Sequence, residues 1–90
     1  MYEVKFTIKF KKDYKNIIKQ GYDIKRLKAV TASLAKGNSL EPKYKDHALA
    51  GNWLGFRECH IAPDWLLIYK IEKDILVLTL TRTGSHSDLF

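Results

Sequence analysis

The sequence contains little that would cross-link the chain or anchor it. Its 90 residues include a single cysteine, Cys59, so it can form neither an internal disulfide nor a cysteine-rich zinc ribbon. No apolar run approaches the ~20 residues that span a bilayer. The first residues alternate apolar and charged side chains, without the apolar region of a cleaved signal peptide. Linkers, repeats and low-complexity segments are also absent. We therefore expect one domain, residues 1–90, in the reducing cytoplasm.

Acidic residues are scarce in the first half of the chain. The whole sequence has 16 Lys and Arg against 10 Asp and Glu, a net charge of +6. Residues 1–46 hold 12 basic and 5 acidic groups, whereas residues 47–90 hold 4 basic and 5 acidic groups. This asymmetry favours a polyanionic partner, with nucleic acid first and an anionic membrane second.

The first half is patterned as a strand followed by two helices. Apolar and polar residues alternate over residues 2–8, which predicts a strand with one solvated face. Residues 10–18 place apolar side chains on one helical stripe, and Gly21 is a suitable stop for that helix. Asp23 can cap a second helix, which is expected to end at Gly37.

The second half changes to strands. Residues 39–52 show no clear period and are expected to form a long ordered loop, a feature that is often functional in compact domains. Strands are predicted at 53–61, 65–71 and 75–82, joined by short turns that favour an antiparallel meander. The order β-α-α-β-β-β predicts an α+β fold, with two helices packed on one antiparallel-rich sheet. The last segment, 83–90, lacks an apolar stripe and is expected to fold back as a tail.

The histidines of the sequence all lie beside predicted turns or loops in its second half, at His47, His60 and His86. In a meander, the first turn and the C-terminal end of the last strand reach the same end of the sheet. The residues expected to converge there are His60, Asp64, Arg82 and His86.

Such a cluster suits metal-free cleavage of RNA by its own 2′-hydroxyl. This reaction needs a base for the hydroxyl proton, an acid for the leaving 5′ oxygen and a cation for the charge on the phosphate. Histidine can be either base or acid because its ordinary pKa of ~6.5 lies near neutrality. Arginine suits the third role, since its planar fork matches phosphate oxygens.

Two other uses of the histidines stay open at this point. Each can be a hydrogen-bonded structural residue, which is the more common role of a lone histidine at a strand end. A metal site is the second use, and its ligands would be His47, His60, His86 and Asp64. No closely spaced pair of histidines supports that metal site.

Two further residues, Cys59 and Phe90, are interpreted separately. Cys59 precedes His60, and strand alternation directs their side chains to opposite faces, so Cys59 is predicted to be a core residue rather than a nucleophile. Phe90 lies beyond any periodic pattern. It can stack on an RNA base, or Leu89 and Phe90 together can close the edge of the sheet.

Three segments carry a more specific pattern. They read KDHALAGNW at 45–53, RECHIAPDWLLIY at 57–69 and RTGSHSDLF at 82–90. In order and spacing they resemble the YafQ-type toxins of the RelE/ParE superfamily. The resemblance implies a RelE-like fold and a bacterial toxin of a type II toxin–antitoxin pair. It further implies an endoribonuclease that cuts mRNA on the translating 70S ribosome and that a cognate antitoxin silences, with no cofactor, metal or membrane partner.

The resemblance also implies which residues form the site. The family's functional positions fall on His47, His60, Asp64, Arg82, His86 and Phe90. His86 is the implied general acid, and His60 or Asp64 is the base. His47 is implied to help in orienting or protonating the substrate.

The remaining implied roles concern the substrate itself. Arg82 would stabilise the phosphate, and Phe90 would position a base. Glu58 is a further candidate because it is a charged neighbour of His60.

Two other functions compete with a ribonuclease. One is a non-catalytic nucleic-acid-binding regulator, and the other is a ParE-like gyrase poison, a branch against which the three histidines argue. The free toxin is expected to be a monomer, and the antitoxin is expected to present an acidic segment to the basic surface.

Overall fold

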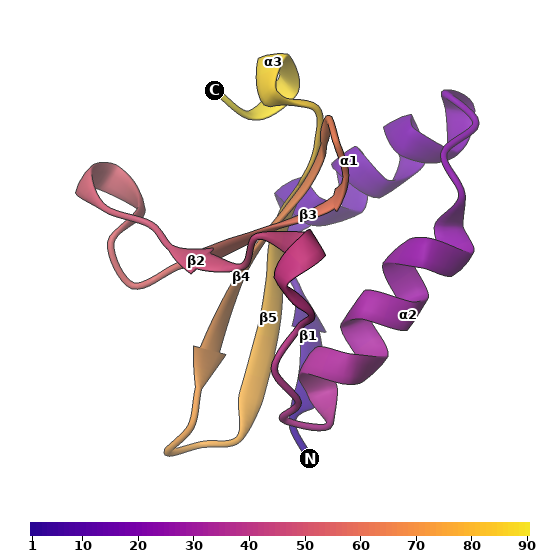
Figure 1. Ribbon diagram of the computed structural model, residues 1–90. Helices are drawn as coiled ribbons and strands as arrows, with labels where there is room; N and C mark the ends of the chain where they lie inside the picture. The colour runs from indigo at the N-terminus through magenta and orange to yellow at the C-terminus, as the bar shows by residue number, and fades with distance from the viewer.

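Residues 1–90 are described by a computed structural model of the chain (Figure 1). The chain begins with β1 (Glu3–Phe6), α1 (Ile8–Lys19) and α2 (Ile24–Ala35). Its middle contains η1 (Pro42–Tyr44), β2 (His47–Ala48) and η2 (Gly51–Trp53), where η1 and η2 are single 3-10 turns. It ends with β3 (Arg57–Ala62), β4 (Trp65–Glu72), β5 (Val77–Gly84) and a short helix, α3 (His86–Leu89). No helix combines the length and the apolar character needed to cross a membrane.

The strands form one sheet in the order β1-β5-β4-β3-β2. Strands β2 to β5 pair antiparallel, whereas β1 runs parallel to β5, with Glu3 opposite Val77 and Phe6 opposite Leu80. Helices α1 and α2 cover one face of this sheet, and the short α3 lies at one end of β5 (Figure 1). The predicted α+β architecture, with two helices on an antiparallel-rich sheet, is confirmed.

Local sequence sets the ends of both long helices. The side chains of Thr7 and Asp23 each accept a backbone N–H from the first turn that follows, at 3.0 and 3.1 Å. Gly21 and Gly37 follow the helix ends in the left-handed region, with φ of 81° and 83°. The predicted cap and stops are therefore confirmed. The first strand is shorter than predicted, because the Thr7 cap begins α1 at Ile8.

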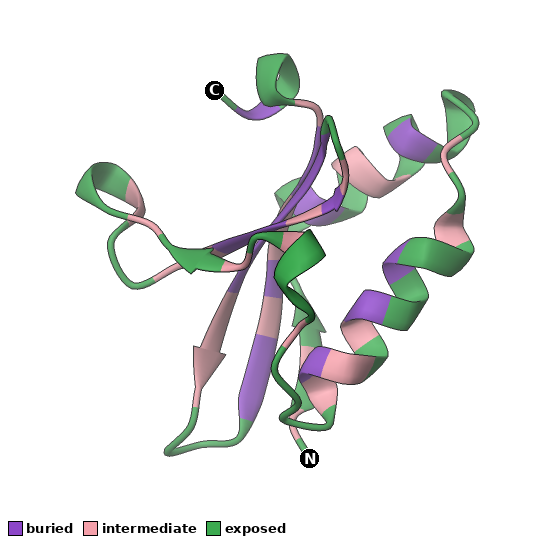
Figure 2. Cartoon of the chain, viewed as in Figure 1, coloured by how far each residue is buried: buried purple, intermediate pink, exposed green.

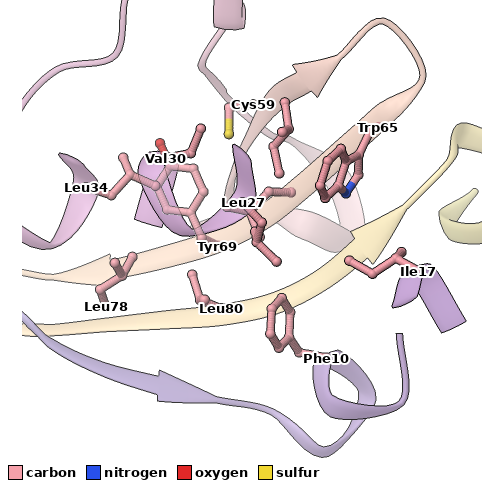
Figure 3. Packing of buried hydrophobic residues seen from close by; sticks show 12 residues of the cluster. Phe10, Ile17, Leu27, Val30, Leu34, Cys59, Trp65, Tyr69, Leu78 and Leu80 are labelled. Carbon is pink, nitrogen blue, oxygen red and sulfur yellow. The ribbon is translucent and has the colours of Figure 1, made fainter. Parts of the chain in front are cut away.

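The main hydrophobic core lies between the helices and the sheet (Figure 3). Its labelled members on the strands are Cys59, Trp65, Tyr69, Leu78 and Leu80, and those on the helices are Phe10, Ile17, Leu27, Val30 and Leu34. Fully burying one such aliphatic or aromatic side chain stabilises a fold by roughly 1.5–3 kcal/mol. Trp65 also keeps its polar atom satisfied, because Nε1 donates to the hydroxyl of Thr83 at 2.9 Å.

A second, smaller core lies on the face of the sheet that α1 and α2 leave open. Leu66 and Ile68 of β4 pack there with Leu89, and partly buried residues at 49, 53 and 56 pack around them. Figure 2 shows α3 exposed except for the buried turn that contains Leu89. The tail folds back as predicted, and this one leucine anchors α3 to the sheet.

Other boundaries differ from prediction for local reasons. The strand predicted at 53–61 begins only at Arg57, because Gly51 and Gly55 have φ of 62° and 93° and bend the chain before it. The strand predicted at 75–82 runs instead from Val77 to Gly84, since Leu76 has a φ of 54° in the preceding turn. The predicted loop contains the short strand β2, which pairs with β3 at the sheet edge.

Candidate active site

The candidate active site is built on the open face of the sheet, where strand register aligns its residues. In an antiparallel pair, residues directly opposite one another project to the same face. His60 is opposite Leu66, and Glu58 is opposite Ile68, so both polar residues lie on the face of the second core. His47 of β2 is opposite Glu58 and joins the same face from the sheet edge.

The three histidines form a row across this face. The ring centroids of His47 and His60 are 6.4 Å apart, and those of His60 and His86 are 5.7 Å apart. The row draws on three separate elements, namely β2, β3 and α3. The structure thus brings together side chains that lie up to 39 positions apart in the sequence, as His47 and His86 do.

His86 is oriented by Asp64 from the turn between β3 and β4. Asp64 Oδ1 accepts the backbone N–H of His86 at 3.1 Å and contacts the His86 ring Nδ1 at 2.8 Å. Because a carboxylate can only accept, Nδ1 is the protonated nitrogen of this pair, and Nε2 is left free for another group. The side-chain hydrogen bond from His86 holds the pKa of Asp64 below its ordinary value. Both side chains remain exposed to solvent.

Glu58 lies beneath the row, next to both His47 and His60. Its side chain is only 7 % exposed, and Oε1 lies 3.6 Å from Nε2 of both His47 and His60. The His47 ring is fixed on its other side, because Nδ1 donates to the Lys45 carbonyl at 2.6 Å. Glu58 is the further candidate that the sequence indicated beside the six implied positions, and its spacing from His60 places both residues on one strand face.

Arg82 is held by α1 and shares no hydrogen bond or ion pair with the histidine row. Nε and Nη2 of Arg82 donate to the two carboxylate oxygens of Asp13 at 2.6 and 3.1 Å, which fixes the guanidinium beside α1. This hydrogen bonding raises the pKa of Arg82 above its already high ordinary value, so the group stays charged. Sequence reasoning missed Asp13, because nothing in the pattern of α1 distinguishes it from a solvated helix residue.

The last two residues, Leu89 and Phe90, differ in burial. Leu89 is buried, whereas the residue Phe90 is 62 % exposed. The Phe90 ring lies 6.5 Å from that of Trp53, edge to face, and Trp53 in turn packs edge to face on Phe56. Leu89 therefore anchors the tail, and Phe90 presents an aromatic surface next to the second core.

A partly buried polar network holds the segment that carries His47. Asp46 Oδ1 accepts the Tyr69 hydroxyl at 2.5 Å and Arg57 Nε at 3.2 Å. Tyr69 is fully buried, and burial is the main cause that raises its pKa well above the ordinary tyrosine value. The phenol therefore remains a donor to Asp46 throughout the neutral and mildly alkaline range. This network was not predicted, since its members come from β3, β4 and the loop before β2.

Cys59 is a core residue, as predicted. It is fully buried on the helix side of β3, and burial raises the pKa of its thiol to about 12, which makes it a poor nucleophile. The groups on the open face that are able to ligate a metal are the histidines and the nearby carboxylates. Nowhere in the chain do three or more His, Cys, Asp or Glu groups come together with the spacing of a metal site.

The fold and the open-face site together define a class: a small α+β protein with a cluster of histidines and carboxylates on the open face of its sheet. The family model for the YafQ bacterial toxin of type II toxin–antitoxin systems matches residues 2–90. The chain belongs to this YafQ toxin family.

Individual relatives agree with this assignment. The chain is 37% identical over 89 residues to the mRNA interferase toxin YafQ of Escherichia coli K12, covering 98% of this chain and 95% of the relative. A metal-bound toxin from Helicobacter pylori has a crystal structure that is 49% identical, with a TM-score of 0.94 and full coverage of both chains. The toxin in a crystal structure of the E. coli DinJ–YafQ complex is 36% identical, with a TM-score of 0.91, covering 100% of this chain and 99% of that one.

Proposed function

We propose that this protein is the toxin of a type II toxin–antitoxin pair and an mRNA interferase that cleaves ribosome-bound mRNA. The observation that carries the proposal is the row of three histidines, braced by Asp64 at one end and by buried Glu58 at the other. The row offers two imidazole nitrogens close enough to act on opposite sides of one phosphate. The name of the E. coli relative, an mRNA interferase toxin, supports the same activity.

In the proposed reaction, His60 takes the proton of the 2′-hydroxyl, and the 2′ oxygen attacks the adjacent phosphorus. The bond from phosphorus to the 5′ oxygen breaks, and His86 donates a proton to that oxygen. The products are a 2′,3′-cyclic phosphate and a 5′-hydroxyl end. His60 suits the base better than Asp64 does, because Asp64 is already hydrogen-bonded to His86. Glu58 orients His60 and His47 from below.

The shallow site favours a requirement for the ribosome. His86 and Phe90 stand on an open surface, with exposures of 56 % for the His86 side chain and 62 % for the residue Phe90. Near the row, the one pocket is a cavity of about 300 Å³ beside His60, which Arg26, Lys43 and Lys45 also line. An open face can accept an extended RNA strand but cannot by itself impose the in-line geometry that 2′-hydroxyl attack needs. The ribosome would supply that geometry by holding the mRNA.

A paired assay of wild type and His86→Ala tests the proposal. Defined mRNA on stalled 70S ribosomes should be cut by wild type, and the variant should lose about 10²- to 10⁴-fold of the rate. A chelator of transition metals that spares Mg²⁺ should leave cleavage unchanged. Growth arrest by both proteins with intact mRNA would contradict the proposal and would direct attention to DNA gyrase instead.

The antitoxin partner is proposed to bind the opposite side of the molecule. A groove of about 550 Å³ runs between α1, α2 and β1, and its floor is apolar, with Phe6 and Leu27 among its lining. The lysines on its rim are Lys11, Lys15 and Lys28. An apolar floor ringed by cations fits an amphipathic acidic segment. Because α1 and α2 cover the other face of the sheet, such binding would leave the histidine row uncovered.

Two matched substitutions at Ala32 test this docking surface. Ala32 lines the groove and is solvent-exposed, so a longer side chain is tolerated by the fold. Ala32→Glu should weaken antitoxin binding at least tenfold through repulsion, whereas Ala32→Lys, of similar length, should not. Both variants should cleave mRNA as wild type does. Equal binding by the two variants would refute the acidic occupant.

A further inference from the structure

We propose that Asp13 of α1 is a positioning residue for cleavage, which holds one edge of the Arg82 guanidinium so that the other edge meets the scissile phosphate. The inference rests on the proposed ribonuclease function and deepens it. Asp13 lies 69 positions from Arg82 in the sequence and touches none of the histidines.

The donors of Arg82 divide into two edges, and Asp13 occupies only one. Nε and Nη2 form the lateral edge, and these atoms donate to Oδ2 and Oδ1 of Asp13 in a bidentate pair. Nη1 and the second Nη2 hydrogen form the terminal edge, and no protein group accepts from Nη1. A guanidinium carries five N–H donors in a rigid plane, so fixing the lateral edge also fixes the direction of the terminal edge.

The position of Asp13 is itself fixed by the sheet. β1 pairs with β5 only from Val77 to Leu80, so beyond that point the edge of β5 that faces away from β4 has no neighbouring strand. Residues in and just before α1 form hydrogen bonds to the backbone along this edge. Asp13 Oδ2 accepts the backbone N–H of Thr83 at 3.2 Å, and the hydroxyl of Thr7 donates to the Thr81 carbonyl at 2.7 Å. One carboxylate thus closes the strand edge and orients the arginine.

Burial indicates that Asp13 stays in place when substrate binds. The side chains of Arg82 and Asp13 are only 20 % and 12 % exposed. A phosphate that displaced Asp13 would leave a largely buried carboxylate without its cation, which is strongly unfavourable. The phosphate is therefore expected to bind the terminal edge while Asp13 keeps the lateral one.

Space for such a phosphate exists beside the pair. A cleft of about 150 Å³ lies against Arg82, and it is lined by Asp13 and Asn16 of α1, by Gln20 just after that helix and by Asp88 of α3. The register also favours approach from the open face, because Arg82 is opposite Ile68, a member of the second core. RNA that crosses the histidine row can therefore continue toward Arg82.

The test compares Asp13→Asn with Arg82→Ala, singly and together, in cleavage of defined mRNA on stalled 70S ribosomes. Asp13→Asn should lower kcat by on the order of 10- to 100-fold, the size of a misplaced catalytic contact. KM should stay unchanged or fall, because removing a negative charge favours RNA binding. In the Arg82→Ala background, Asp13→Asn should have no further effect, and Asp13→Glu should recover part of the loss. Asp23→Asn, which removes the same charge at the start of α2, is the matched control and should cleave normally.

The opposing results are distinct. Wild-type cleavage by folded Asp13→Asn, or losses that multiply in the double variant, would overturn the positioning role. A loss confined to KM would overturn it as well. If Asp13→Asn does not fold, Arg82→Lys is measured in its place. A single ammonium cannot bind both Asp13 and the phosphate, so cleavage should fall at least tenfold. Unchanged cleavage by Arg82→Lys would overturn the inference. A wild-type protein that leaves ribosome-bound mRNA intact overturns the proposed function first, and this inference with it.

Discussion

Tyr69→Phe removes one hydroxyl from the core and leaves the packing of the ring intact. The lost hydrogen bond is the 2.5 Å contact to Asp46, whose side chain is 21 % exposed and also accepts from Arg57. A hydrogen bond to a charged group contributes about 1.5–3 kcal/mol. Because Asp46 keeps Arg57 and some contact with water, we expect a loss near the middle, about 2 kcal/mol of the free energy of unfolding. At roughly 4–8 °C per kcal/mol for a domain of this size, Tm should fall by roughly 8–16 °C.

The assay is urea and thermal unfolding of Tyr69→Phe beside Tyr22→Phe. Tyr22 packs edge to face on Trp65 in the same core, but its hydroxyl has no partner within the protein. The control should therefore change stability by less than about 0.5 kcal/mol. Cleavage of mRNA should also fall severalfold in Tyr69→Phe alone, because Asp46 anchors the segment that carries His47.

The same residue makes a pH prediction with a definite sign. The pKa of Tyr69 is raised in the folded chain, so its proton stabilises the fold fully below the ordinary tyrosine pKa of ~10. As pH rises above that value, the unfolded chain loses this proton first, and the stability should decline. Tyr69→Phe should show a smaller alkaline decline. Equal stability of Tyr69→Phe and Tyr22→Phe, at neutral and alkaline pH alike, would refute the assigned network.

Three further predictions concern other parts of the molecule. Leu89→Ala should lower the free energy of unfolding by about 2 kcal/mol in urea melts and should also reduce cleavage, because Leu89 anchors the helix that carries His86. Phe90→Ala, at an exposed position, should reduce cleavage while changing the free energy of unfolding by less than about 0.5 kcal/mol. Cys59 should resist alkylation in the native protein at pH 8 and react only after unfolding, and rapid labelling of the native protein would contradict its burial. Asp64 should stabilise the fold above its ordinary pKa and lose that contribution as pH falls through its lower folded value. His86→Ala should weaken this acid dependence in pH-dependent thermal melts, because the side-chain hydrogen bond is lost while the backbone N–H of residue 86 still donates to Asp64.

Much of the architecture could be predicted from local pattern, for a physical reason. The periods of strands and helices, the Asp23 cap and the stops at Gly21 and Gly37 depend on contacts within a few residues. The same locality explains why Cys59 could be assigned to the core from strand alternation alone. Family membership was likewise carried by three short segments, since they contain all of the candidate site residues.

Only the tertiary structure decided how the site is braced and where its arginine lies. Glu58 beneath two histidines, and Tyr69 beneath the segment of His47, depend on the pairing of β2, β3 and β4, which no local pattern specifies. The Asp13–Arg82 pair depends on where β1 stops along β5, a register set by packing of the whole sheet. The sequence by itself determined the elements and the candidate residues, because both depend on local pattern. Contacts between residues far apart in the chain depend on the packed core, so the fold decided which of the candidates meet.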